Sequence, residues 1–224
     1  MIEILYADAH IVVCVKPVGI LSQDAQQTCV PQLLRQQFPG KNVYCVHRLD
    51  KAVGGVMVYA LTPRAAAGLS RTVQDKTLEK TYFSVLRGVP EQQGVLEDLL
   101  FHDKMKNKTY IVDRMRKGVK DAKLTYCSLD SRQEQTLVCV RLYTGRTHQI
   151  RVQFAGRNLP LIGDGKYGGK QAGTDLALWS CALKFPHPVT GKIMKFFKRP
   201  PELEPWTSFD DAYYVENQTE RECL

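Results

Sequence analysis

Short runs of apolar, β-branched and aromatic residues, each about the length of a strand, constrain the fold of this chain most. They follow one another with few helical patterns between them, instead of alternating strictly with helices. Runs of strands of this kind favour an α+β fold with a mainly antiparallel sheet. The predicted strands cover residues 11–15, 55–61, 81–86, 95–100, 123–129 and 136–143, and residues 176–185 are expected to pair with 193–197 as a hairpin.

Helices are predicted at three places from apolar spacing and end signals. Apolar side chains between Val30 and Phe38 repeat at helical spacing, and a Pro-Gly pair stops that pattern. Thr62, followed by proline, offers an N-cap for a second helix that runs to about residue 73. Thr147 is the expected N-cap of a third helix.

Length and composition suit a single globular domain over residues 1–224, of which 44% are hydrophobic and 24% charged. No stretch approaches the roughly 20 consecutive apolar residues of a membrane-spanning helix, and the start lacks the pattern of a secretory signal. Seven cysteines occur without a CxxC pair, which favours a reducing, cytoplasmic setting over a disulfide framework or a zinc site. We therefore expect no metal and no membrane, and we expect the polar residues 207–224 to fray.

The positive charge is concentrated in one segment. Lys plus Arg number 31 and Asp plus Glu 23, which gives a net charge of +8. Residues 103–123 hold eight basic residues against three acidic ones and lie between two predicted strands. Such a basic loop is either a solvated surface or an arm that binds phosphates, and its length favours the arm. The basic residues are Lys104, Lys106, Lys108, Arg114, Arg116, Lys117, Lys120 and Lys123.

Polar residues in strongly structured surroundings mark two candidate site segments. His47, Arg48 and Asp50 precede a glycine pair at the start of a buried strand, where a ligand could approach the backbone closely. An aspartate at such a turn can also simply cap local amides. Tyr82 lies in an alternating strand and is either a stacking platform for a base or a half-buried core tyrosine.

A third candidate segment places Arg146, His148 and Arg151 at the start of the predicted third helix. His148 and Arg151 would share one helical face there. The group suits a phosphate site, an ion-pair network, or a guanidinium that keeps a carboxylate ionised.

The order and sequences of these segments resemble the RluA-type pseudouridine synthases. The resemblance spans about residues 4–197 and leaves no room for the separate N-terminal RNA-binding module that some of these enzymes carry. It implies a mixed, mostly antiparallel sheet in two halves flanked by helices, with the active cleft between the halves, and it implies no metal or cofactor. The matching stretches are HRLDKAVGG, KTYFSVLRG and GRTHQIRVQFAGRNLPLIGDGKYG, flanked by KPVGILSQ and FPHPVTGK.

The resemblance implies the isomerisation of uridine to pseudouridine in ribosomal or transfer RNA, by a monomer without an obligate protein partner. Asp50 is similar to the family's catalytic aspartate, Tyr82 to the tyrosine that packs against the target uracil, and Arg151 to the arginine that pairs with the aspartate. Arg48 is similar to the arginine that contacts RNA near the extruded nucleotide. Further RNA contacts are expected from His47, Lys104, Lys106, Lys108, Arg146 and His148.

Two positions depart from the family's pattern. The small hydroxyl pair usually found before the glycine after HRLD is Val53-Gly54 here, and the histidine common after QIRV is Gln153, which cannot titrate. Neither change affects the three residues similar to the catalytic ones, so activity remains the favoured interpretation.

Two other classes of function fit parts of the sequence. A non-catalytic RNA-binding or ribosome-assembly factor on the same scaffold would tolerate Asp50→Asn. A hydrolase would release free base and would need a second carboxylate, which none of the three segments supplies in the right context. For the isomerase itself, both a glycal route and attack at C6 of the ring fit the sequence.

Overall fold

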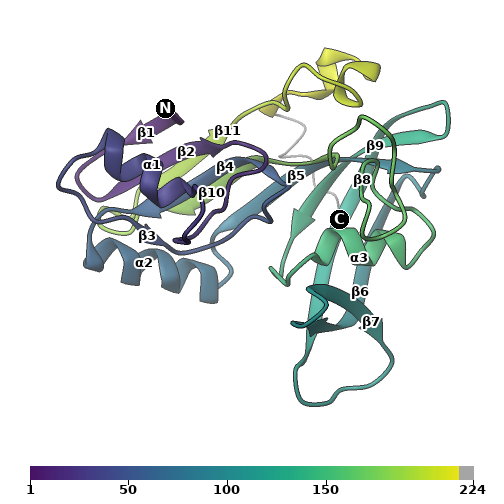
Figure 1. Ribbon diagram of the computed structural model, residues 1–224, viewed down its shortest axis with the longest axis horizontal. Coiled ribbons are helices and arrows are strands. Elements are labelled where there is room, and N and C mark those ends of the chain that lie inside the picture. The colour runs from purple at the N-terminus through teal and green to yellow at the C-terminus, as the bar shows by residue number, and fades with distance from the viewer. Residues whose placement is uncertain (217–224) are drawn as a thin grey trace. The chain divides into compact units, whose positions relative to one another are not determined.

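The computed structural model describes residues 1–216 and divides into two compact units (Figure 1). Unit 1 comprises Met1–Lys80 and Trp179–Lys198, and unit 2 comprises Thr81–Leu178 and the chain from Arg199 onward. The sheet strands in both units are mixed but mostly antiparallel, which confirms the α+β prediction.

Unit 1 is a sheet with the strand order β1-β2-β4-β10, extended by β11 beside β10 and by β3 beside β4. Only the β4–β10 pair is parallel among the pairs described here. Its elements are β1 (Glu3–Ala7), β2 (Ile11–Lys16), α1 (Val30–Gln37), β3 (Tyr44–Cys45), β4 (Gly54–Ala60), α2 (Pro63–Gln74), β10 (Leu178–Pro186) and β11 (Ile193–Phe197).

The core of unit 1 follows from two wholly buried strands. Every residue of β2 and of β4 is buried, and Leu69 of α2 packs in the same cluster as Val13 and Val58. Thr62 caps α2 by accepting a hydrogen bond from the Ala65 amide at 3.2 Å, as predicted.

Unit 2 has the strand order β5-β9-β8-β6-β7, and the β9–β8, β8–β6 and β6–β7 pairs are antiparallel. Tyr126 of β8 and Phe154 of α3 meet edge to face in its core, 5.2 Å apart. The elements are β5 (Glu79–Arg87), β6 (Gln93–Asp103), β7 (Lys108–Val112), β8 (Val119–Arg132), β9 (Gln135–Leu142), α3 (Gln149–Ala155) and the 3₁₀ turns Trp206–Ser208 and Asp211–Tyr213.

The basic segment 103–123 is not the loop that we predicted. It contains the strand β7, which pairs with β6 in register from Asp103↔Lys108 to Leu99↔Val112. β7 has five residues, and only Thr109 among them is buried. The strand was missed because the charged residues around it outweighed the short Thr-Tyr-Ile-Val run, although those residue types favour strands.

The tail that we expect to fray contains two buried aromatic residues within residues 207–216, and residues 217–224 lie outside the described part of the chain. Phe209 and Tyr214 are 4% and 5% exposed, and the Tyr214 hydroxyl donates to the Trp206 carbonyl at 2.8 Å. Tyr214 also meets Phe83 edge to face at 5.4 Å. Aromatic burial therefore outweighs the polar composition of this segment.

Five cysteines within residues 1–216 carry reduced thiols: Cys14, Cys29, Cys45, Cys139 and Cys181. No helix within residues 1–216 is long and apolar enough to cross a membrane.

Candidate functional site

Asp50 lies on a loop whose backbone is held on both sides. The Ser22 hydroxyl donates to the Leu49 carbonyl at 2.9 Å, and the Gly19 amide donates to the Lys51 carbonyl at 2.8 Å. Asp50 itself is partly exposed. The backbone residues directly before and after Asp50 are therefore fixed by hydrogen bonds.

Lys16 adds a buried cation beneath this loop. Its side chain is fully buried, and its ammonium donates to the carbonyls of Pro17 at 2.8 Å, Ile20 at 2.6 Å and Lys51 at 3.2 Å. Burial lowers the pKa of Lys16 to about 8, while the charge of Asp50 acts in the opposite direction. Lys16 begins the flanking motif KPVGILSQ, but the sequence patterns assigned this residue no role.

The glycine pair after Asp50 is approached by a strand and not by a ligand. A Cβ on Gly55 would lie 2.2 Å from the Ser180 carbonyl oxygen, and one on Gly54 would lie 2.4 Å from the Trp179 ring. Gly55 has a φ of +120°, which also requires glycine. The expectation of ligand approach here is therefore corrected: β10 occupies this space.

His47 and Arg48 differ sharply in exposure. His47 is buried, and its Nε2 accepts a hydrogen bond from the Val58 amide at 3.1 Å, so the imidazole is neutral. Burial, and then the charge of Lys80, lower the pKa of His47 to about 3. Arg48 is exposed, with Nη1 3.4 Å from Gln23 Oε1. The RNA contacts expected of both residues stay predictions, and only Arg48 is open to solvent.

Tyr82 in β5 is only 5% exposed, more deeply buried than the half-buried position considered for it. Two residues on, the Ser84 hydroxyl donates to the Ala177 carbonyl at 2.8 Å. The stacking role of Tyr82 stays a prediction.

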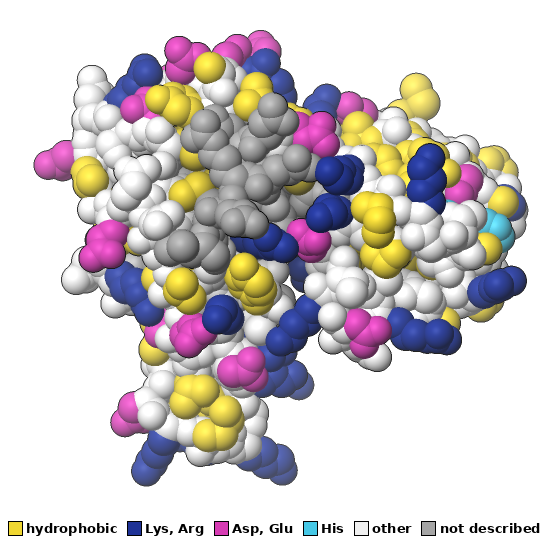
Figure 2. Space-filling model, turned by 180° about the vertical axis from the view of Figure 1, so that it is seen from behind, with side chains coloured by type: hydrophobic (Ala, Val, Ile, Leu, Met, Phe, Trp, Pro, Cys, Tyr) yellow, Lys and Arg dark blue, Asp and Glu magenta, His cyan; other side chains and the backbone are white. Residues whose placement is uncertain are grey.

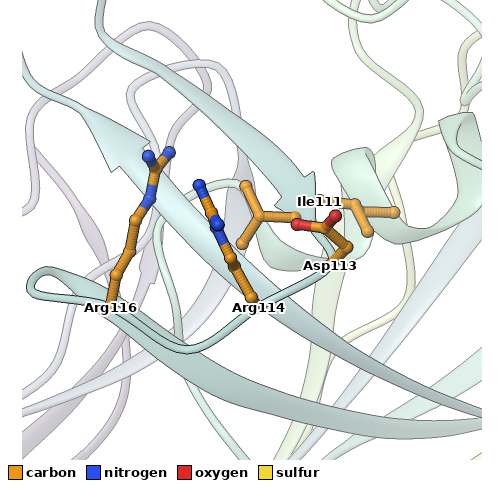
Figure 3. Close-up of a pocket in the computed structure, with 5 residues that line it drawn as sticks. Ile111, Asp113, Arg114 and Arg116 are labelled. Carbon is orange, nitrogen blue, oxygen red and sulfur yellow. The ribbon is translucent and has the colours of Figure 1, made fainter.

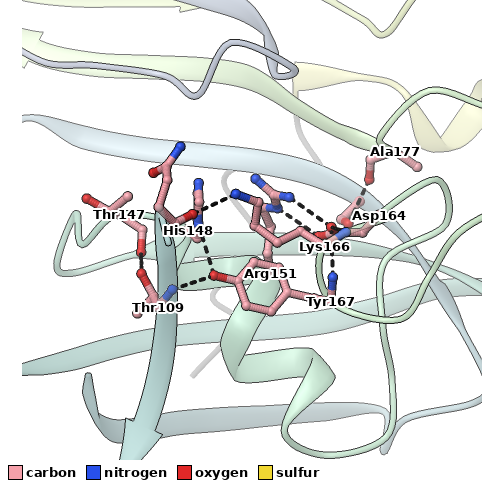
Figure 4. Close-up of polar contacts among 10 residues, drawn as sticks. Thr109, Thr147, His148, Arg151, Asp164, Lys166, Tyr167 and Ala177 are labelled. Atoms are coloured by element: carbon pink, nitrogen blue, oxygen red, sulfur yellow. Dashed lines mark hydrogen bonds and ion pairs between the residues drawn. The ribbon is translucent and has the colours of Figure 1, made fainter. Parts of the chain in front are cut away.

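Arg151 forms a buried, bidentate ion pair with Asp164 (Figure 4). Its Nε and Nη2 donate to the two carboxylate oxygens at 2.7 and 2.8 Å, and the side chains of the pair are 9% and 0% exposed. Asp164 lies in a stretch that resembles the family, but the sequence patterns assigned this residue no role. Its position between two glycines after an apolar pair is the signal that could have marked it. The pairing of Arg151 with Asp50 stays a prediction.

The ring of Tyr167 lies against this ion pair. Asp164 Oδ1 accepts the amides of Lys166 at 3.0 Å and Tyr167 at 3.2 Å, which turns the chain back toward α3. The Arg151 guanidinium then lies 5.2 Å from the centre of the Tyr167 ring, within the range of a cation–π contact. One carboxylate thus places both the guanidinium and the ring.

The hydroxyl of Tyr167 contacts β7 and the residue that begins α3. It accepts the Thr109 amide of β7 at 2.7 Å and lies 2.9 Å from Nδ1 of His148 (Figure 4). His148 is buried and adopts a φ of 55°. The Lys108 ammonium lies 5.4 Å from the same ring. Lys108 and His148, both expected to contact RNA, therefore border Tyr167.

The start of α3 differs from the prediction. The N-cap is His148, which makes no side-chain cap bond, so Thr147 is not the cap. Instead, Gln149 Oε1 accepts the Thr144 hydroxyl at 2.8 Å and the Arg146 amide at 3.1 Å. The Gln149 side chain therefore stabilises the turn that leads into α3 and is not a cap, because neither donor belongs to the helix.

Two further polar residues near α3 are held by β-strand partners. The Arg146 Nε donates to the Asp121 carbonyl at 2.8 Å, and the RNA contact expected of Arg146 stays a prediction. Gln153, at the position of the family's histidine, is fully buried and donates to Leu96 O at 3.1 Å and Asp98 Oδ2 at 2.8 Å. This glutamine therefore attaches α3 to β6.

The turns on either side of β7 carry exposed cations. Lys104 and Lys106 are exposed at the first turn. At the second turn, Arg114 and Arg116 extend in the same direction beside a cavity of about 520 Å³ that Ile111 also lines (Figure 3). Figure 2 shows Lys and Arg side chains beside exposed hydrophobic ones at the end of unit 2 that carries these strands. This surface suits an anionic polymer.

The described residues hold no group of three or more His, Cys, Asp or Glu side chains that could bind a metal ion. The chemistry that they offer is that of a carboxylate on a fixed loop in unit 1 and an anchored guanidinium in unit 2.

Comparisons with known proteins agree with the resemblance noted in the sequence. The family model described as RNA pseudouridylate synthase matches residues 10–156, which include Asp50, Tyr82 and Arg151. The chain is 30% identical to tRNA pseudouridine synthase C of Yersinia pestis, over 92% of this chain and 88% of that protein. It is 33% identical to ribosomal large subunit pseudouridine synthase D of Vibrio cholerae, over 90% of this chain and 68% of that protein.

Two solved human structures share the fold. Human RNA pseudouridylate synthase domain containing 1 gives a TM-score of 0.77 at 21% identity, covering 100% of this chain and 94% of that one. Human RNA pseudouridylate synthase domain containing 4 gives a TM-score of 0.74 at 24% identity, covering 89% of this chain and 88% of that one.

Proposed function

This chain belongs to the RNA pseudouridylate synthase family, and we propose that it isomerises a uridine of ribosomal or transfer RNA to pseudouridine, with the Asp50 carboxylate as the nucleophile. Pseudouridine synthases are isomerases. The relatives named above act on transfer RNA and on the large ribosomal subunit, so either RNA is a candidate substrate.

The reaction moves one bond and changes no oxidation state overall. The N1–C1′ glycosidic bond breaks, the freed uracil rotates, and C5 bonds to C1′ while the C5 proton is lost and N1 gains a proton. The target base is normally stacked, so the nucleotide must leave the helix at a cost of a few kcal/mol. Charge develops at the sugar when the bond breaks, and an ionised carboxylate both stabilises that charge and can trap the fragment covalently.

The observation that carries the proposal is the fixed position of Asp50. Its loop is held by Ser22, by Gly19 and by the buried Lys16 ammonium, all through backbone carbonyls of the residues on either side of Asp50 or earlier in the loop. A nucleophile benefits from such preorganisation because little reorganisation is needed at the moment of reaction.

Arg151 and Tyr82 receive supporting roles in the proposal. Arg151 supplies the guanidinium that pairs with the Asp50 carboxylate and orients it. Tyr82 holds the detached uracil while it turns, and its hydroxyl is available as a base if the reaction passes through a glycal.

RNA contacts are proposed for the exposed cations, with Arg48 beside the extruded nucleotide and Lys104 and Lys106 on backbone phosphates. Lys108, Arg146, His148 and His47 are held by contacts within the protein, so their proposed part in RNA binding is to shape the surface.

The test is pseudouridine mapping by carbodiimide primer extension after incubation with total ribosomal and transfer RNA. Wild-type protein is expected to introduce pseudouridine, and Asp50→Asn is expected to abolish it while remaining folded and bound to RNA. Asp75→Asn, which changes an exposed carboxylate at the end of α2, is the matched control and should retain activity. A folded Asp50→Asn protein with wild-type activity would exclude Asp50 as the nucleophile.

A further inference from the structure

We infer that Asp164, together with the ring of Tyr167, positions the guanidinium of Arg151 for the reaction. This inference rests on the proposed function, because it assigns the support of a residue that the proposal uses. Both residues lie beyond residues 10–156, the part of the chain that the family model matches. The sequence patterns indicated no role for Asp164 or Tyr167.

The contact between Asp164 and Arg151 fixes an orientation and not only a distance. Nε and Nη2 each donate to a different oxygen of one carboxylate, at 2.7 and 2.8 Å. Two parallel bonds of this kind align the guanidinium plane with the carboxylate plane and stop rotation about the end of the side chain. With Asp164 fully buried, water does not compete for these bonds.

Tyr167 restricts the guanidinium from a second direction. Asp164 Oδ1 accepts the Tyr167 amide at 3.2 Å, and the ring of that residue lies 5.2 Å from Arg151 Cζ. The Tyr167 hydroxyl is held in turn by the Thr109 amide at 2.7 Å. A flat ring against a flat guanidinium limits motion out of the plane that the carboxylate has set.

The ion pair also determines what a substitution should change. Arginine stays protonated at any pH that proteins experience, so replacing Asp164 by asparagine does not remove the positive charge of Arg151. It removes one of the two charged acceptors and brings an amide N–H₂ against guanidinium donors. Asp164→Asn should therefore misalign Arg151 while leaving it charged.

The experiment measures single-turnover tritium release from a pool of transcribed transfer and large-subunit ribosomal RNA that carries uridine labelled at C5. For Asp164→Asn, we expect the rate constant to fall roughly 10- to 100-fold, because small misplacements of positioned groups cost that much. The Kd for the same RNA should change less than about twofold, since no phosphate contact is removed.

The split between rate and affinity separates positioning from a general loss of structure. Asp164→Asn should lower the single-turnover rate at an unchanged Kd, because Arg151 stays charged and the contacts to RNA stay in place. A rate within about twofold of wild type would overturn the positioning role, as would a rise in Kd that accounts for the whole loss of rate.

Asp130→Asn is the matched control. Asp130 pairs with Arg132 at 2.7 Å, so this variant also removes a carboxylate from an arginine in the same unit, and its rate should stay within about twofold of wild type. A loss of rate in Asp130→Asn equal to that in Asp164→Asn would mean that breaking any ion pair in this unit slows the reaction, and would overturn the assignment.

Tyr167→Leu keeps the inference testable if Asp164→Asn does not fold, because Tyr167 is only partly buried. This variant removes the ring and leaves the carboxylate, and its rate should fall at an unchanged Kd. A wild-type rate in Tyr167→Leu overturns the inference. Asp50→Asn on the same RNA distinguishes failure of the positioning role from failure of the proposed function. If Asp50→Asn is inactive while Asp164→Asn and Tyr167→Leu are fully active, only the positioning role is refuted.

Discussion

The buried ammonium of Lys16 donates a hydrogen bond to the carbonyl of Lys51 at 3.2 Å, directly after Asp50 in the chain. The same nitrogen holds the carbonyls of Pro17 and Ile20. One side chain therefore connects the end of β2 to the loop of the proposed nucleophile. Its three donors match three acceptors, which is the full capacity of an ammonium group.

Lys16→Met should destabilise the protein by about 3 kcal/mol, because it leaves buried carbonyl groups without a donor. The reaction rate should fall as well, since one support of the Asp50 loop is removed. Urea denaturation gives the free energy of unfolding. Lys41→Met, at an exposed position, serves as the control and should be near neutral. A destabilisation in Lys16→Met no larger than in this control would show that the Lys16 hydrogen bonds contribute nothing net.

His47 should make the protein less stable in mild acid. Its pKa is about 3 in the folded state because of burial, against about 6.5 in an unfolded chain. The unfolded state alone binds this proton between these two values, so stability is lost as the pH falls below about 6.5. The contribution at pH 5 is a loss of about 2 kcal/mol relative to neutral pH.

The measurement for His47 is urea denaturation at pH 7.5 and pH 5, for wild type and for His47→Gln. Glutamine offers an amide oxygen to the Val58 amide but does not titrate, so the variant should lose less stability on acidification. Equal losses of stability in the two proteins would contradict a buried, neutral His47.

Gly55→Ala should cost far more stability than Gly40→Ala. Both glycines have positive φ, but the φ of +120° at Gly55 lies further from the left-handed region open to other residues than the +75° at Gly40, so the backbone strain is larger at Gly55. Only at Gly55 would the new Cβ also lie 2.2 Å from the Ser180 carbonyl oxygen, whereas nothing lies within 4 Å at Gly40. Thermal unfolding of the two variants compares strain plus the separation of β4 from β10 with strain alone. Similar melting temperatures would mean that the strands part easily.

Changing Lys104 and Lys106 together to glutamine should weaken RNA binding and flatten its salt dependence. Removal of one phosphate interaction reduces the slope of log Kobs against log salt by about 0.7 for single-stranded RNA. Filter binding at several salt concentrations gives this slope. Lys41→Gln with Lys76→Gln removes the same charge from exposed positions in unit 1 and should leave the slope unchanged. Identical slopes in both double variants would show that the turn before β7 does not bind RNA phosphates.

Local patterns predicted much of the secondary structure. Residues 193–197 form a strand with the predicted bounds, and Thr62 caps its helix as expected. The predictions for β7 and for the cap of α3 were wrong. Thr109 of β7 is buried between β6 and Tyr167, and the Gln149 side chain accepts the Thr144 hydroxyl and the Arg146 amide in the turn before α3.

The amino-acid sequence by itself indicated the family and the mostly antiparallel α+β fold and marked Asp50, Tyr82 and Arg151 as candidates, because motifs and strand patterns are read from residues close together in the chain. Only the tertiary structure decided which groups support them. The Lys16 ammonium donates to a carbonyl 35 residues away in the chain, and Ser180 of β10 pairs with Gly55 of β4. Arg151 meets Asp164 across a loop. Hydrogen bonds and van der Waals contacts act over a few ångströms in space. The sequence alone does not show which residues far apart in the chain come within that distance after folding.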